Sequence, residues 1–220
     1  MRIEPGTIIA VLIILFVSFP VHEFSHALAA YRLGDSTAKM FGRLTLNPIV
    51  HFDPIGGVFL LISALLGVGI GWAKPTPVNP LNLRYGRWGE AIVAFAGPAS
   101  NLVIAAAAAI PLRYIVHGSL IASPTFGYGS LIFDTLSSFV AINLVLMVFN
   151  LVPIPPLDGS KVMFAFMNPR TVWQIRPTLE QYGFLILILF IAIPIGSSGS
   201  LVNIIFDTVL QPIFNILVGI

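Results

Sequence analysis

The chain has 220 residues, of which 57% are hydrophobic and only 9% are charged, against about 25% charged residues in an ordinary soluble domain. This is too little polar surface for a water-soluble globule, and the composition predicts a membrane protein that crosses the bilayer several times. With 11 basic against 9 acidic residues the net charge is only +2, and the sequence has no basic stripe of the kind that nucleic-acid binding requires, so we expect no nucleic-acid partner.

Six apolar stretches are candidates for membrane segments, for which a helix needs about 20 residues. They lie at about residues 6–31, 54–72, 90–112, 129–152, 182–197 and 200–220. The stretch 54–72 is marginal because it contains five glycines, and 182–197 is short. We expect one all-α transmembrane domain over residues 1–220, a helical bundle with its core at about 6–165 and accessory helices at about 180–220.

The first stretch contains two histidines and a glutamate in the spacing His-x-x-x-His, at His22, Glu23 and His26. No small-residue cleavage site precedes them, so we expect a retained span rather than a signal peptide. Residues i and i+4 share one helix face, so both imidazoles can bind one zinc ion while Glu23 takes a proton from a water molecule that the metal activates. The alternative is a pair of packed histidines beside a surface glutamate. Ionisable groups in a membrane span are costly and commonly functional, which favours zinc.

Two irregular connections follow the first two stretches. Residues 37–54 are interrupted by Gly42 and two X-Pro pairs, so we expect a small membrane-associated β-hairpin there. Three prolines between residues 75 and 80 exclude a helix interior and predict extended backbone at the membrane surface. Either segment could pair with an unwound substrate by strand addition, or could cover the metal site as a static plug.

A catalytic zinc ion commonly has three protein ligands, and a chain without cysteine must supply the third from His, Asp or Glu. Asp158 is the best candidate, because three prolines end the preceding apolar stretch and Gly159 permits a turn that can aim the carboxylate back. The alternative is that Asp158 caps the helix that begins at Ser160.

Three motifs together resemble those of the site-2 protease family of intramembrane zinc metalloproteases. They are HEFSH at 22–26, GPASN at 97–101 and NLVPIPPLDG at 150–159, and the resemblance covers about residues 15–165. It implies that His22, His26 and Asp158 bind zinc and that Glu23 is the general base. It also implies a membrane-spanning protein or peptide as substrate, cleaved within or near its membrane segment. We expect a compact member without a PDZ or CBS domain.

Three further polar residues lie near the expected site. Asn101 and Asn150 are amides in apolar surroundings that could stabilise the oxyanion or orient the substrate. The alternatives are close helix packing at Asn101 and a helix cap or interhelical hydrogen bond at Asn150. His51 could contact substrate, assist proton transfer or occupy the open position of the zinc ion, although hydrogen bonding at the interface is commoner for histidine.

The position of the third ligand constrains the topology. If all six stretches crossed the membrane, Asp158 would lie on the side away from the histidines, whereas a re-entrant segment at 54–72 brings the three ligands together. The re-entrant topology also collects nine of the 11 basic residues on one side, which the positive-inside rule assigns to the cytoplasm. These nine are at positions 32, 39, 43, 74, 84, 87, 161, 170 and 176. We therefore expect a multi-pass cell-membrane protein with an external N-terminus and the zinc site nearer the cytoplasmic face.

A second hypothesis is a membrane transporter or scaffold that moves or holds a divalent metal ion. Glu23 distinguishes the two hypotheses, because a hydrolase needs it for cleavage and a transporter does not. The inverted repeat of many transporters is not evident in the sequence.

Overall fold

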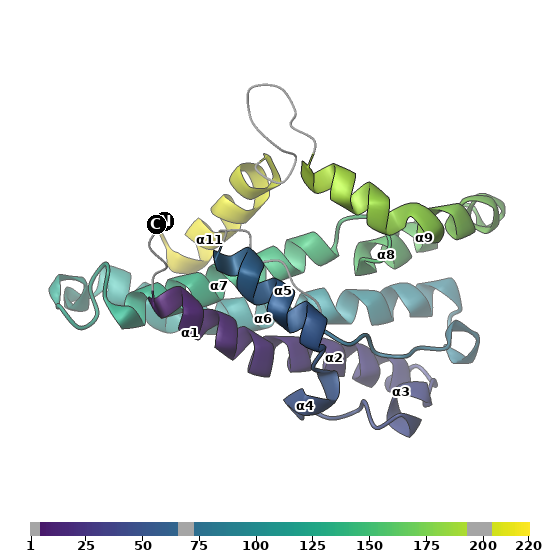
Figure 1. The fold of residues 1–220 in the computed structure, drawn as a ribbon, viewed down its shortest axis with the longest axis horizontal. Coiled ribbons are helices and arrows are strands. Elements are labelled where there is room, and N and C mark those ends of the chain that lie inside the picture. The colour runs from purple at the N-terminus through teal and green to yellow at the C-terminus, as the bar shows by residue number, and fades with distance from the viewer. Residues whose placement is uncertain (1–4, 66–72, 193–203) are drawn as a thin grey trace.

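The computed structural model describes residues 5–65, 73–192 and 204–220, and these residues form helices and connections with no strand among them (Figure 1). The α-helices are α1 (Pro5–Ile13), α2 (Phe19–Arg32), α3 (Thr37–Met40), α4 (Pro48–His51), α5 (Pro54–Leu65), α6 (Arg87–His117), α7 (Leu131–Asn150), α8 (Asp158–Phe166), α9 (Pro169–Ala192) and α11 (Gln211–Val218). Short 3₁₀ turns lie at Pro80–Asn82 and Ser119–Ala122, and π-helical turns at Ile14–Ser18 and Phe206–Leu210.

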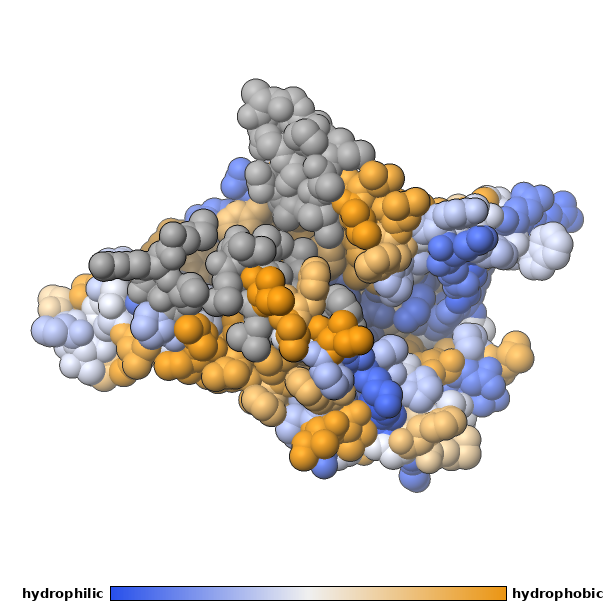
Figure 2. Space-filling view, viewed as in Figure 1, coloured by the Kyte–Doolittle hydropathy of each residue, from blue (hydrophilic) through white to orange (hydrophobic). Residues whose placement is uncertain are grey.

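Three helical segments of the described residues are long and apolar enough to cross a membrane: Pro5–Arg32, Arg87–His117 and Leu131–Asn150. At 1.5 Å per residue, even the shortest is about 30 Å long, the thickness of the hydrocarbon core. The expected all-helical membrane class is therefore confirmed. Figure 2 shows hydrophobic side chains over α1 and α5 on the face in view and hydrophilic ones toward the end where α9 begins.

Helix α6 is the centre of the bundle and packs against α2, α7 and α8. Its contact with α7 uses small residues, Ala105 and Ala109, which allow close approach of the two helices. Leu112, Val140 and Leu144 complete the buried interior there. The guanidinium of Arg176 on α9 forms two hydrogen bonds with the carboxylate of Glu90 on α6, at 2.7 and 3.0 Å.

The end of α2 and the start of α6 lie at the same end of the bundle. The Arg84 backbone N–H donates to the Leu33 carbonyl at 2.8 Å, and the Arg87 guanidinium donates to the Met167 carbonyl just after α8 at 2.7 Å. The ends of α2 and α8 and the start of α6 therefore lie together at this end of the bundle. The three expected zinc ligands require such an arrangement, because two of them are on α2 and the third is at the start of α8.

The β-hairpin expected at 37–54 is wrong, because these residues form the short helices α3 and α4 and the irregular turns around them. The Asn47 side chain accepts a hydrogen bond from the Ile49 N–H at 3.1 Å, and Pro48 occupies the first helical turn. An Asn-Pro pair is a turn signal, but it is equally a helix N-cap followed by the proline that a first turn favours.

The re-entrant segment expected at 54–72 is not supported either. Its first part is helix α5, which begins at Pro54 and has Asp53 accepting from the Gly56 N–H at 2.8 Å, whereas residues 66–72 lie outside the described part of the chain. The Lys74 N–H donates to the His51 carbonyl at 2.9 Å, so residues 51 and 74 meet. Residues 73–79 are without helix, as their prolines predict.

A buried carboxylate fixes the connection between residue 79 and α6. Asp35 is wholly buried just after α2 and accepts hydrogen bonds from the Asn79 N–H (2.8 Å) and the Asn82 amide (3.1 Å), besides two from Thr37. Burial raises the pKa of the Asp35 carboxyl, but these hydrogen bonds outweigh burial and hold the pKa below its ordinary value. The carboxylate thus stays ionised and ties the 73–82 segment to the end of α2.

Candidate metal centre

Helix α2 carries three ionisable side chains, His22, Glu23 and His26, and all three are buried. The preceding turn, Ile14–Ser18, is π-helical, and Pro20 follows it. Proline has no N–H for the carbonyl one turn earlier, and π-helical turns widen a helix, frequently at functional sites. This helix irregularity therefore lies directly before the histidines.

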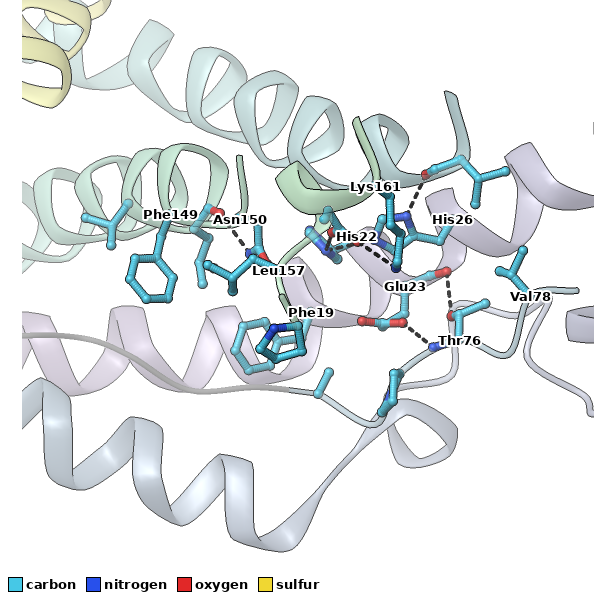
Figure 3. A pocket seen from close by; sticks show the side chains of 17 residues that line it. Phe19, His22, Glu23, His26, Thr76, Val78, Phe149, Asn150, Leu157 and Lys161 are labelled. Carbon is cyan, nitrogen blue, oxygen red and sulfur yellow. Dashed lines mark hydrogen bonds and ion pairs between the residues drawn. The ribbon is translucent and has the colours of Figure 1, made fainter. Parts of the chain in front are cut away.

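The two histidines, which are labelled in Figure 3, and Asp158 bring three ligand atoms together. His22 Nε2 is 3.0 Å from His26 Nε2, and Asp158 Oδ2 is 3.4 Å from His22 Nε2 and 3.1 Å from His26 Nε2. Ligands at zinc distances of about 2.0–2.2 Å in a tetrahedron lie about 3.3 Å apart. The spacing of the three atoms is therefore close to that of three residues that would hold one zinc ion.

Asp158 reaches the histidines because the chain turns sharply after α7. Helix α7 ends at Asn150, and Asp158 is the first residue of α8, whose N-cap is Leu157. Asp158 is thus not the helix cap considered as its alternative. A Cβ atom at Gly159 would lie 2.2 Å from the Leu151 carbonyl oxygen, so only glycine allows this close return of the chain.

The two oxygens of the Asp158 carboxylate have different partners: the two histidines on one side and Lys161 on the other. Oδ2 faces the histidines, and Oδ1 lies 3.3 Å from the Lys161 ammonium group. Burial raises the pKa of the Asp158 carboxyl, but the His26 and His22 imidazoles, when protonated on Nε2, and the Lys161 ammonium group lower it more, so without a metal the pKa lies well below its usual range. An ionised carboxylate is the form that binds a metal ion.

Hydrogen bonds at the other ring nitrogens orient both imidazoles. His26 Nδ1 lies 2.7 Å from the Val93 carbonyl oxygen, and His22 Nδ1 lies 2.5 Å from Asn101 Oδ1. Both partners are oxygen acceptors, so each Nδ1 carries a proton, and a neutral imidazole with that proton has its Nε2 lone pair free for a metal. The Val93 carbonyl could not be found from the sequence, because it is backbone.

The two asparagines expected at the site have different positions. Asn101 is wholly buried, and both ends of its amide are engaged: Oδ1 with His22, and Nδ2 with Asn143 Oδ1 at 3.2 Å. This geometry favours orienting His22 over contacting an oxyanion. Asn150 lines the cavity at the metal centre, and its amide donates to the Leu146 carbonyl at 2.9 Å.

That cavity is bounded by α2, the 73–78 segment, the C-terminal part of α7 and the turn into α8 (Figure 3). Thr76 joins two of these walls: its N–H donates to Glu23 Oε2 at 2.8 Å, and its hydroxyl donates to the Glu23 carbonyl at 3.0 Å. The sequence did not indicate this contact with Glu23. It holds the carboxylate at the cavity beside the two imidazoles.

His51 does not join the metal-ligand cluster found among the described residues. It is almost completely buried, and its Nε2 donates to the Thr45 carbonyl at 2.8 Å, whereas Nδ1 has no hydrogen-bond partner among the residues that the structure describes. The geometry therefore gives His51 the hydrogen-bonding role expected as the commoner alternative rather than zinc contact.

Comparison with known proteins identifies similar chains. Residues 120–194 match the model of peptidase family M50. "Putative zinc metalloprotease YwhC" of Bacillus subtilis is 39% identical over 191 residues, which cover 84% of this chain and 81% of YwhC. "Putative zinc metalloprotease Rip2" of Mycolicibacterium smegmatis is 32% identical over 192 residues, which cover 86% of this chain and 69% of Rip2. No solved structure matches.

Gly97 provides the space in which the two imidazoles meet. A Cβ atom at this position would lie 2.3 Å from His26 Nε2 and 2.6 Å from His22 Nε2. The Gly97→Ala substitution should therefore displace both ligand atoms and weaken zinc binding at least about tenfold, as other changes beside metal ligands do. Competition with a chelator measures this affinity.

Alanine should itself stabilise helix α6 by up to about 1 kcal/mol relative to glycine, so weakened helix formation cannot account for the loss. Ser100→Ala is the matched control on the same helix, because the Ser100 hydroxyl donates to the Gly97 carbonyl and Ser100 is not in the metal-ligand cluster found among the described residues. Unchanged zinc affinity in Gly97→Ala would show that the imidazoles do not meet at this glycine.

Proposed function

From the premise that this chain is a zinc metalloprotease of peptidase family M50, the site-2 protease family, we propose a more specific activity. In this proposal it cleaves membrane proteins within or near their membrane-spanning segments. Its zinc ligands in this proposal are His22, His26 and Asp158. Because the chain belongs to a protease family, the protease hypothesis is preferred to the hypothesis of a metal transporter or scaffold. The observation that carries the proposal is the meeting of three ligand atoms beside Glu23, in one cavity lined by residues of three helices of membrane-spanning length.

A bound zinc ion would act as a Lewis acid: it would polarise the scissile carbonyl and lower the pKa of a bound water molecule to about 7. Glu23 is the proposed general base: it accepts a proton from the attacking water and passes it to the leaving amine. The Thr76 N–H at Oε2 keeps the carboxylate in one orientation while it does so. Asn150, which lines the same cavity, is proposed to orient the substrate or its oxyanion. Asn101 is proposed to act through His22.

The substrate must be extended at the scissile bond, because a helix hides its carbonyls in its own hydrogen bonds. The 73–78 segment is proposed as one wall of the cleft that receives it, opposite α7. Pro75 and Pro77 have no N–H, and the N–H groups of Lys74 and Thr76 are already donated within the protein. Pairing of a substrate strand with this segment would therefore rely mainly on the segment's carbonyl groups.

The distribution of basic residues supports a location in the cell membrane with the metal centre toward the cytoplasmic face. Nine of the 11 Lys and Arg residues lie at the last residue of α2, at the first residue of α6, between these two helices, or after α7. Hydrogen bonds join these parts of the chain at one end of the bundle. The positive-inside rule assigns that end to the cytoplasm. The proposal treats residues 1–220 as one transmembrane protease domain, with its core at about 6–165 and accessory helices at about 180–220.

Replacing Glu23 with Gln separates catalysis from metal binding. Gln is isosteric but cannot accept the proton, so cleavage of a model transmembrane substrate should fall at least about 100-fold, the usual contribution of a general base, while one zinc ion per chain is retained. Glu180→Gln, at an exposed position on α9, is the control and should keep full activity. Full activity of Glu23→Gln would contradict the assignment of the base.

The topology can be tested with single cysteines, because the chain has none of its own. Trp173 before the middle of α9 and Tyr128 before α7 are both strongly exposed, at 82% and 69%. In intact cells a membrane-impermeant thiol reagent should label Tyr128→Cys, and in inverted vesicles it should label Trp173→Cys. The reverse pattern would place the metal centre toward the external face.

A further inference from the structure

Asn143 is a polar residue at a place where the proposed mechanism gives it no task. It lies in the middle of α7, between Ile142 and Leu144, and its side chain is wholly buried. It is not among the residues that line the cavity at the metal centre. An amide inside a membrane-spanning helix is costly unless its hydrogen bonds are satisfied, so its partners indicate why it is there.

Those partners connect Asn143 to the metal centre across three helices. Asn143 Nδ2 donates to the Phe139 carbonyl on α7 at 2.9 Å, and Asn143 Oδ1 accepts from Asn101 Nδ2 on α6 at 3.2 Å. Asn101 Oδ1 in turn lies 2.5 Å from His22 Nδ1 on α2. All three side chains are buried, so water does not compete for these hydrogen bonds.

The donors and acceptors in this chain can be arranged in one way only. The Phe139 carbonyl only accepts, so Asn143 must give it the NH₂ group, which leaves Asn143 Oδ1 facing Asn101. That oxygen also only accepts, so Asn101 must present its own NH₂ group there and its Oδ1 to His22. The proton of the neutral imidazole therefore lies on Nδ1, and Nε2 keeps its lone pair.

We infer that Asn143 is a positioning residue that acts through Asn101 to fix the tautomer and ring orientation of His22, so that Nε2 faces the metal. The inference rests on the proposed zinc site and deepens it. His26 provides the contrast, because its Nδ1 is held by the Val93 carbonyl, which is backbone and cannot rotate as an amide side chain can. Of the two histidines, His22 is therefore the one whose orientation depends on side chains, Asn101 on α6 and Asn143 on α7.

The tautomers can be measured without zinc and without a substrate. Nitrogen-15 NMR of ring-labelled histidine in the metal-free full chain, at a pH where imidazole is neutral, distinguishes Nδ1–H from Nε2–H; the His22→Gln variant assigns the His22 signal. In the wild type His22 should be the Nδ1–H tautomer. A predominantly Nε2–H His22 in the wild type would overturn the inference without recourse to any Asn143 variant.

Two substitutions at position 143 then test the role of the amide oxygen. Asn143→Leu removes the acceptor, so Asn101 can rotate, His22 should populate both tautomers, and zinc affinity should fall about 10–100-fold. Asn143→Asp, as a neutral carboxyl, keeps an acceptor oxygen for Asn101 and a donor for the Phe139 carbonyl, so it should stay within about threefold of the wild-type zinc affinity. The His26 tautomer should be unchanged in both variants.

Val140→Ala is the control for packing, because Val140 is a wholly buried apolar residue one turn away on the same helix. It should leave the His22 tautomer and the zinc affinity unchanged. An unaltered tautomer in Asn143→Leu, or an equal loss of affinity in Val140→Ala, would overturn the positioning role. Failure of the proposed function itself would look different: wild-type protein that binds no zinc, whatever the tautomer of His22.

Discussion

The meeting of two imidazoles and one carboxylate inside an apolar bundle is the constraint on which the rest of this structure depends. His22, His26 and Asp158 come from positions far apart in the sequence, and each is costly to bury without partners. Their convergence requires that α2 and α8 reach the same level of the bundle and that no side chain lies between them. The close return of the chain at Gly159 meets the first requirement, and the bare backbone at Gly97 meets the second.

Around this centre, the three ligand side chains and Glu23 each have a defined partner. The Val93 carbonyl holds His26, Asn101 holds His22, Lys161 lies at the second oxygen of Asp158, and the Thr76 N–H holds Glu23. In a low-dielectric interior such hydrogen bonds are strong and an unpaired polar group is expensive, so the partners limit each side chain to one orientation. The chain has few charged residues, and this scarcity is consistent with a membrane interior in which ionisable groups are kept where chemistry needs them.

Much of this site could be predicted from the sequence, because its residues carry patterns. The i, i+4 spacing of His22 and His26 has a direct geometric meaning on a helix, and a carboxylate after a proline-rich helix end is conspicuous in a chain with so few acidic residues. The hairpin expected at 37–54 was wrong because X-Pro pairs signal both turns and helix starts, and tertiary contacts decide between them. The roles of Val93 and Thr76 could not be predicted, since backbone groups leave no pattern. Asn143 did leave a signal, an amide within an apolar span, but the sequence does not say which helix it faces.

X-ray absorption at the zinc edge of the purified full-length Glu23→Gln protein is the most direct measurement of the proposed centre. It should give a first shell of two imidazole nitrogens and one carboxylate oxygen at about 2.0–2.2 Å, with the open position filled by a further oxygen. The imidazole signal should fall by half in a His26→Ala variant of that protein. A first shell without imidazole, or one that His26→Ala leaves unchanged, would contradict the account.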